Sequence, residues 1–359
     1  MKILIDIGHP AHVHYFKNLI QIMKKRGHKF CVVSRDKEVT HSLLESYGID
    51  YISRGKGAKS LLGKFLYLFK ANYIIYKIAK KFKPDIFLSF ASPYAAHVSY
   101  ILRKEHIAYT DTEHAKLGNI AFSKFTNTIV TPDCLPIDFG HNHIKFNGYM
   151  ELSYLHPNYF KPDKSILEDL KINASDNYIL IRFVSWDASH DFGKNGLSYH
   201  SKIKLVKKLS KNYKVFISSE GELPKELEKH KVKIPHHKMH DFLNFCSLFI
   251  GEGATMASEC VMLGVPAIYI NTIECSTCTE QEERYNLLYN YRVFDGVIEK
   301  AFDLLKIKNK AIFQQRSKTM IKEKIDVTMF MVYLLENFPK SRMLIRENPK
   351  FNKFNSIGY

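Results

Sequence analysis

One stretch in the second half of the chain decides the fold. Residues 248–270 read Leu248-Phe-Ile-Gly-Glu-Gly-Ala-Thr-Met-Ala-Ser-Glu-Cys-Val-Met-Leu-Gly-Val-Pro-Ala-Ile-Tyr-Ile270. An apolar strand at 248–250 meets Gly251-Glu-Gly253, and a helix over 254–263 follows at once. Gly264-Val-Pro266 ends that helix and starts a second apolar strand. This order predicts a parallel strand–helix–strand unit with its first loop at the carboxyl edge of a sheet.

The glycine-rich turn predicts a nucleotide site. A helix N-terminus presents free N–H groups and the positive end of the helix dipole, and both attract phosphate. We expect Gly253, Ala254, Thr255 and Met256 to surround the phosphates, with Thr255 also capping the helix. Glu259 lies one turn further along the same face, where a carboxylate can accept both hydroxyls of a ribose. The alternative is an ordinary crossover that carries an incidental glutamate.

Strand–helix alternation extends over the rest of the chain. Before residue 150 we expect strands at Ile3–Ile7, Phe30–Ser34, Ile86–Phe90, Ile107–Thr110 and Thr128–Thr131. After an irregular segment, 148–176, the pattern restarts with a strand at Tyr178–Val184. We therefore predict an α/β protein of two Rossmann-like domains, 1–150 and 151–325, whose doubly wound parallel sheets face a central cleft that binds a ligand. Residues 326–359 are expected to form a helix that packs on the first domain, followed by a basic tail.

Length and composition agree with this architecture. The chain has 359 residues, 45% of them apolar and 25% charged, as in ordinary globular proteins of two domains. No segment has the ~20 uninterrupted apolar residues that a membrane span needs. Asp6 interrupts the first apolar run, unlike a signal peptide, so we expect a cytoplasmic protein. Cys275 and Cys278 form a lone C-x-x-C without the second ligand pair of a zinc site.

The net charge of +17 is concentrated in one segment. Between Tyr51 and Pro84 there are nine Lys or Arg and no Asp or Glu. Leucines and aromatic residues recur among these cations at helical spacing. This pattern is typical of a helix that lies on an anionic membrane surface, and equally of a core-packed helix with a solvated basic face.

Five short segments resemble one family. They are Ile7-Gly-His-Pro-Ala-His-Val-His-Tyr-Phe-Lys-Asn18, Tyr109-Thr-Asp-Thr-Glu-His-Ala115, Arg182-Phe-Val-Ser-Trp-Asp-Ala-Ser-His-Asp191, His237-Lys-Met-His-Asp241 and Gly251–Pro266. In these segments, and in their order up to about Leu335, the chain resembles an uncharacterised bacterial and archaeal family of predicted glycosyltransferases. That family belongs to the GT-B superfamily and is related to the hydrolysing UDP-sugar 2-epimerases. The resemblance implies a GT-B fold, UDP as the nucleotide, and no required metal or other cofactor.

Histidines follow the first predicted strand. In Gly8-His-Pro-Ala-His-Val-His14, Gly8 permits a tight turn next to a ligand. His9 and His12 are candidates for a phosphate donor or a general base, and His14 falls inside the following helix. The H-x-x-H-x-H spacing also allows a metal site, and capping or packing histidines are the third interpretation.

Acidic residues follow the strand at Ile107–Thr110. Asp111-Thr-Glu-His114 places three ionisable groups directly after a buried strand, which is costly unless they are used or paired. The resemblance to the hydrolysing epimerases implies a catalytic role for Glu113, with Asp111 and His114 as alternatives. A solvated loop is the interpretation without function.

The second domain holds the remaining candidates. Those for donor binding, carried by the resemblance, are Arg182, Ser185, His190, His240 and Glu280. Arg182 offers a planar cation for the diphosphate, or else pairs with Asp187 or Asp191. His240 is expected beside the base and ribose, or on the surface. Glu280 is expected to open a helix, Glu280–Leu288, near the donor sugar.

Together these features predict a glycosyltransferase that moves a sugar from a nucleotide-sugar to an acceptor hydroxyl. An acceptor in cell-envelope polysaccharide or glycolipid synthesis suits the basic, aromatic segment. The alternative enzyme is a hydrolysing UDP-sugar 2-epimerase, for which Asp111 and Glu113 are suitable carboxylates. No nucleic-acid motif accompanies the positive charge, so nucleic acid is not an expected partner.

Overall fold

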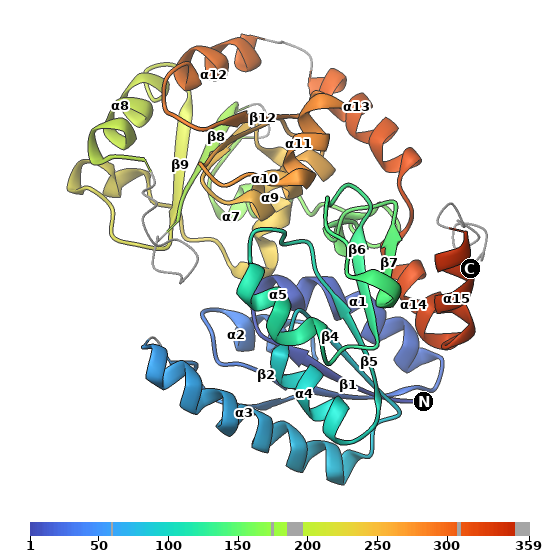
Figure 1. Ribbon diagram of the computed structural model, residues 1–359. Helices are drawn as coiled ribbons and strands as arrows, with labels where there is room; N and C mark the ends of the chain where they lie inside the picture. Colours follow the sequence, from blue (N-terminus) through green and yellow to red (C-terminus); the bar gives the residue numbers. More distant parts are fainter. Residues whose placement is uncertain (59, 174–175, 185–196, 307–309, 349–359) are drawn as a thin grey trace. The chain divides into compact units, whose positions relative to one another are not determined.

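The computed structural model describes residues 1–58, 60–173, 176–184, 197–306 and 310–348 (Figure 1). The chain divides into two compact units, each with a parallel sheet of its own. Unit 1 comprises Met1–Tyr154 and Lys324–Tyr359, and unit 2 comprises Leu155–Glu323. The α/β class with two doubly wound parallel sheets is therefore confirmed.

The described part of unit 1 has a seven-stranded sheet in the order β3-β2-β1-β4-β5-β6-β7. The strands are β1 (Lys2–Ile7), β2 (Lys29–Ser34), β3 (Tyr51–Ser53), β4 (Ile86–Phe90), β5 (Glu105–Tyr109), β6 (Thr128–Pro132) and β7 (His143–Phe146). All pair in parallel, and the central strands are buried because helices lie on both faces (Figure 1). The strand order reverses between β1 and β4, and open α/β sheets bind ligands at the carboxyl ends beside such a point.

In unit 1, helix α1 packs against α14 on one side of the sheet. Helix α4 packs against both α3 and α5. Its helices are α1 (Pro10–Lys25), α2 (Thr40–Ser46), α3 (Leu61–Phe82), α4 (Pro93–Ile101), α5 (Lys116–Ser123), η1 (Gly140–Asn142), α14 (Val327–Glu336) and α15 (Lys340–Glu347). Short helix α6 (Leu152–Leu155) lies at the boundary. The Thr328 hydroxyl donates to the Ser153 carbonyl at 2.6 Å, and Arg26 pairs with Glu336 at 2.6 Å. These contacts attach the C-terminal segment to unit 1.

The described part of unit 2 has a five-stranded sheet in the order β12-β11-β10-β8-β9. The strands are β8 (Tyr178–Phe183), β9 (Lys214–Ser219), β10 (Leu248–Gly251), β11 (Ala267–Ile270) and β12 (Leu288–Tyr291). The helices are α7 (Ser165–Asp169), α8 (Tyr199–Leu209), η2 (Lys225–His230), η3 (His236–Lys238), α9 (Met239–Phe245), α10 (Ala254–Met262), α11 (Ser276–Glu283), α12 (Val297–Lys306) and α13 (Lys310–Glu323). Here the order reverses between β8 and β10, where Arg182 pairs in register with Gly251.

Several local predictions are wrong. Strands β3, β7 and β12 and helix α5 were not predicted, and the tail beyond Pro339 begins with helix α15. The helix predicted at Glu280–Leu288 is displaced, because α11 runs from Ser276 to Glu283 and Leu288 begins β12.

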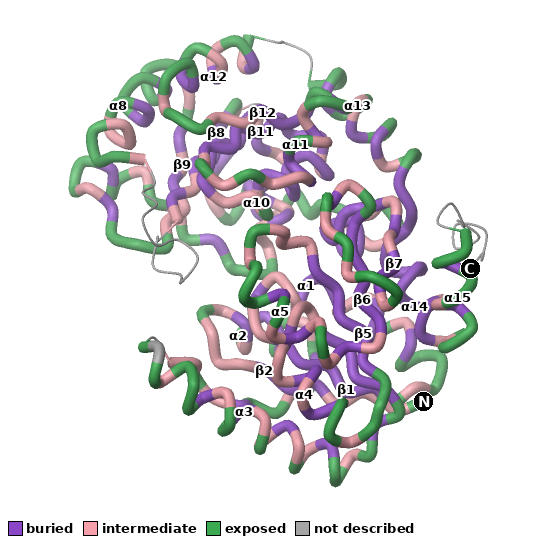
Figure 2. Tube along the Cα trace, in the orientation of Figure 1, coloured by how far each residue is buried: buried purple, intermediate pink, exposed green. Residues whose placement is uncertain are grey.

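Helix α3 carries two apolar stripes. Tyr67, Ala71, Ile75 and Ala79 are buried. A second set lies in solvent, with exposed fractions of 57–70%: Leu62, Phe65, Leu66, Phe69 and Tyr73. The steps of three or four residues place this second set on one face, the exposed side of α3 in Figure 2. The helix is therefore core-packed, and its outer face is apolar as well as basic.

Candidate functional site

The turn after β10 places a bare helix N-terminus at the carboxyl edge of the unit 2 sheet. Gly253 is the N-cap residue of α10, and no side chain caps this helix. Thr255 is exposed in the first turn, so the prediction that it caps the helix is wrong. Ala254 and Met256 flank it and are half-buried. The uncapped N–H groups and the dipole of α10 suit an anion.

Glu259 lies one turn further into α10 and is held by a histidine. The His240 Nε2 atom of α9 is 2.9 Å from Glu259 Oε1, and both side chains are buried. The surface position considered for His240 is therefore wrong. The pair fixes the direction of the Glu259 carboxylate, because a buried hydrogen-bonded carboxylate has few alternative rotamers.

Glu252, which the sequence analysis did not single out, organises the loop next to this helix. Its side chain is 1% exposed and accepts hydrogen bonds from the backbone N–H groups of Val184, at 3.1 Å, and Leu197, at 2.6 Å. It therefore joins the end of β8 to the start of α8. The sequence did contain a signal for this role of Glu252, since an acid between two glycines after a buried strand requires a partner.

Arg182 sits near the end of β8. Its guanidinium donates to Ser218 Oγ and to Glu220 Oε1, both at 2.6 Å. The candidates Ser185 and His190, and the alternative partners Asp187 and Asp191, lie outside the described residues.

Helix α11 begins before the predicted helix, so its residues occupy other positions than expected. Glu280 lies in its second turn and pairs with Arg284 at 3.4 Å. Gln281 is fully buried and donates to Ser258 Oγ on α10 at 2.8 Å. Cys278 is buried beside it, and Cys275 precedes the helix. These contacts join α11 to α10.

The first two histidines after β1 accept hydrogen bonds from nearby backbone N–H groups. His9 is the N-cap of α1, and its Nδ1 accepts from Ala11 N at 3.2 Å. His12 Nδ1 accepts from Gly8 N at 3.3 Å. A ring nitrogen that accepts a backbone N–H has its lone pair occupied, so these two Nδ1 atoms are not placed to act as a general base. Burial first, and then the nearby His9, Lys37 and Arg54, hold the pKa of His12 well below its usual value.

His14 does not join the other two histidines. It is buried, stacks on Tyr154 and bonds the Tyr47 hydroxyl at 3.3 Å. The three histidines therefore do not form the metal site that their spacing allows. Within either unit, no three His, Cys, Asp or Glu side chains of the described residues lie close enough to share an ion.

Asp111 lies two residues after the end of β5, and its surroundings change the pKa of its carboxyl. Burial raises the pKa of its carboxyl to about 6, a hydrogen bond from the Thr112 hydroxyl at 3.0 Å opposes the rise, and the Glu113 charge adds to it. Glu113 is half-buried and His114 is exposed. A carboxyl that titrates near pH 6 is suited to accept a proton at neutral pH.

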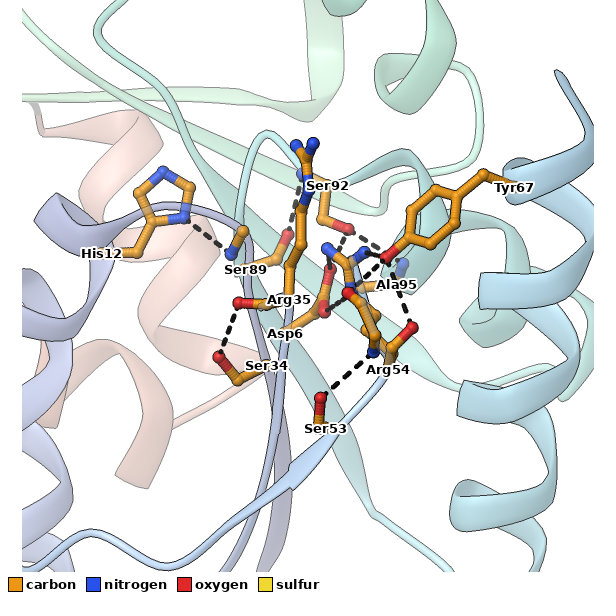
Figure 3. A network of polar contacts seen from close by, with 12 residues as sticks. Asp6, His12, Ser34, Arg35, Ser53, Arg54, Tyr67, Ser89, Ser92 and Ala95 are labelled. Carbon is orange, nitrogen blue, oxygen red and sulfur yellow. Dashed lines mark hydrogen bonds and ion pairs between the residues drawn. The ribbon is translucent and has the colours of Figure 1, made fainter. Parts of the chain in front are cut away.

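A buried ion pair, also missed from the sequence, supports this edge of unit 1 (Figure 3). Arg54, which follows β3, donates to the two Asp6 carboxylate oxygens at 2.8 and 3.3 Å and to the Tyr67 hydroxyl of α3 at 2.6 Å. Ser92, the N-cap of α4, donates to Asp6 at 2.5 Å. The network joins β1, β3, α3 and α4 behind Gly8, where an added Cβ would lie 3.6 Å from Arg54 Nη2.

Solved structures share this architecture. A putative UDP-N-acetylglucosamine 2-epimerase from Listeria monocytogenes has a TM-score of 0.70 and 12% identity, with 95% of this chain and 97% of that chain covered. The spinosyn rhamnosyltransferase SpnG, complexed with spinosyn aglycone, has a TM-score of 0.60 and 11% identity, with 94% and 100% covered. At these identities the likeness shows the fold, which is GT-B.

Comparisons in sequence identify the family. The uncharacterized protein MJ0665 of Methanocaldococcus jannaschii is 25% identical over 279 residues, which are 75% of this chain and 81% of that protein. Residues 1–338 match the family described as protein of unknown function DUF354. Since this match covers nearly the whole chain, the protein belongs to the DUF354 family.

Proposed function

We propose that the protein is a glycosyltransferase that takes a sugar from a nucleotide-sugar, with UDP as the nucleotide, and transfers it to an acceptor hydroxyl. The observation that carries the proposal is the donor site of unit 2. The uncapped N-terminus of α10 follows Gly251-Glu-Gly253, and Glu259 lies one turn deeper with its carboxylate fixed by His240. Phosphates at the helix start and ribose hydroxyls at Glu259 match these two features.

The departing diphosphate would be stabilised without a metal or other cofactor. The α10 dipole supplies one positive partner, and Arg182 supplies a planar fork for phosphate oxygens. The present partner of Arg182, Glu220, is 36% exposed in its side chain, and such pairs contribute little in water. Arg182 can therefore exchange Glu220 for a phosphate at small cost.

Unit 1 would supply the base. Burial raises the pKa of Asp111 to about 6, close to neutral, whereas the Nδ1 atoms of His9 and His12 already accept backbone N–H groups. We therefore assign proton removal from the acceptor to Asp111, with Glu113 as the neighbouring acid whose charge helps to raise the Asp111 pKa.

The acceptor would be a cell-envelope glycan precursor or glycolipid held at an anionic membrane surface. No described helix is long and apolar enough to cross a membrane. The outer face of α3 combines exposed leucine and aromatic side chains with Lys70, Lys77 and Lys80. Such a face suits reversible binding to anionic lipid.

A hydrolysing UDP-sugar 2-epimerase is the second candidate, favoured by the two adjacent acids Asp111 and Glu113. Incubation with UDP-GlcNAc alone separates the two. Free epimerised sugar and UDP in stoichiometric amounts would identify the epimerase and contradict the transferase.

The donor site is tested by calorimetry with UDP. Glu259→Ala should raise the Kd about 10–100-fold, the loss expected for a charged hydrogen bond. Glu222→Ala, which changes an exposed glutamate of the same unit, is the control and should bind UDP as the wild type does. An unchanged affinity in folded Glu259→Ala would remove Glu259 from the nucleotide.

A further inference from the structure

We propose that Arg35 forms an anion site in unit 1 that binds a phosphate or diphosphate group of the acceptor. This inference rests on the proposed transferase and specifies its acceptor. Arg35 directly follows β2, and its backbone N–H donates to the Ile7 carbonyl at 2.9 Å. It therefore lies at the carboxyl edge of the sheet, next to the turn that begins with Gly8.

The Arg35 guanidinium has no anionic partner among the described residues. Its Nε is buried and makes no hydrogen bond. The neighbouring acids are engaged elsewhere. Asp6 pairs with Arg54 at 2.8 Å, and Asp36 lies 3.8 Å from His41 and 4.0 Å from Lys56. A buried, unpaired N–H of a cation is costly unless a ligand satisfies it.

Gly57 provides the place for this guanidinium. A Cβ at Gly57 would lie 2.1 Å from Arg35 Nη2 and 2.4 Å from Arg35 Cζ. The guanidinium therefore lies against the Gly57 Cα. Gly57 is not among the residues with positive φ, so its backbone conformation does not require glycine. The absent side chain instead makes room for the cation.

The surroundings favour phosphate over a neutral group. The Asp6 and Arg54 charges cancel each other, which leaves Arg35 as the uncompensated cation next to this pair. Helix α1 begins at Pro10 on the adjacent turn, and the His12 Nδ1 accepts from Gly8 N, so the neutral His12 ring carries its proton on Nε2 as a donor. A planar guanidinium beside a helix N-terminus is matched to phosphate oxygens.

The position of α3 indicates what carries the phosphate. The helix begins at Leu61, a few residues after Gly57, and its exposed apolar stripe starts at Leu62 and Phe65. An anion site adjoining the start of an exposed apolar face suits an amphiphile, with its phosphate at Arg35 and its hydrocarbon along α3.

The test is a calorimetric titration of the full chain with inorganic pyrophosphate and with a water-soluble short-chain prenyl diphosphate, each in the presence of saturating UDP. Arg35→Gln should raise the Kd for both at least about 10-fold. Its control, Arg346→Gln, removes an exposed charge on α15 and should change neither. Gly57→Ala keeps the charge but displaces the guanidinium and should weaken binding as Arg35→Gln does. The control for this variant is Gly118→Ala, whose added Cβ would lie 3.7 Å from Ala115 Cβ, an ordinary van der Waals distance.

Each outcome decides one question. Binding that is unchanged in Arg35→Gln and Gly57→Ala, or absent in the wild type at millimolar ligand, overturns the site. Tighter binding of the prenyl diphosphate supports a lipid-linked acceptor, and equal binding of both ligands supports the site with a small phosphorylated acceptor. The proposed function fails separately: if UDP does not bind, the same titrations without UDP still report on Arg35.

Discussion

Replacing Asp111 by asparagine should stabilise unit 1 above pH 6 and slow the proposed sugar transfer. Burial raises the pKa of this carboxyl from 3.8 to about 6. The folded state therefore binds more protons than the unfolded state between about pH 4 and pH 6, so stability falls as the pH rises through that window. At 1.36 kcal/mol per pH unit the full loss is about 3 kcal/mol, and partial exposure of the side chain reduces it to about 1–2 kcal/mol. An asparagine side chain at this position cannot ionise and avoids this cost.

Urea unfolding of the two proteins at pH 4 and pH 8 measures this difference. The stability advantage of Asp111→Asn should be small at pH 4 and reach about 1–2 kcal/mol at pH 8. Asp50→Asn, which changes an exposed acid of the same unit, is the control and should show no such dependence. An advantage that is equal at both pH values would refute the raised pKa of Asp111. If Asp111 is the base, turnover should also fall about 10²–10⁴-fold while UDP affinity is kept.

Two further predictions concern the donor helix and α3. His240→Ala should weaken UDP binding about 10-fold, because Glu259 loses its positioning partner, and it should add little when Glu259 is already alanine. Calorimetry on the two single variants and the double variant measures this coupling. Fully additive losses of binding free energy would contradict it. The chain should co-sediment with phosphatidylglycerol vesicles at low salt and be released at high salt, because each cation near the surface contributes about 1 kcal/mol. Changing Lys64, Lys70, Lys77 and Lys80 to Glu should abolish vesicle binding. The double variant Phe65→Ser with Phe69→Ser should weaken it. If the wild-type chain does not bind vesicles at low salt, the membrane surface is removed from the proposal.

The sequence predicted the inner strands well and three outer strands poorly, for one physical reason. Strands such as β8 and β10 are buried on both faces and contain runs of three or more apolar residues. The missed strands β3, β7 and β12 are all at the edges of their sheets, where the burial requirement is weaker. β7 reads His-Ile-Lys-Phe, and β12 reads Leu-Tyr-Asn-Tyr, so neither has an apolar run.

The candidate site was likewise predictable only in part. The α10 turn was predictable because glycines, strand and helix are contiguous in the sequence. The contacts that orient its residues were not, since His240 and Glu259 are 19 residues apart and Asp6 and Arg54 are 48 apart. Gly57 and Arg35 likewise meet only after β2 and β3 have paired. The resemblance named several of these positions but did not supply their partners.

The choice between transfer and epimerisation rests on unit 1, because the donor site of unit 2 would serve both reactions. Asp111 and Glu113 alone do not decide, since either reaction can use a carboxylate. The outer face of α3 does discriminate: five large apolar side chains, more than half exposed, form one stripe on a helix whose other face already fills the core. A contiguous exposed apolar patch usually marks an interaction surface, and the hydrocarbon of an amphiphilic acceptor would occupy it, whereas a water-soluble nucleotide-sugar would not. Transfer to an amphiphilic acceptor would use both Asp111 and this stripe, so it explains more of the molecule than epimerisation does.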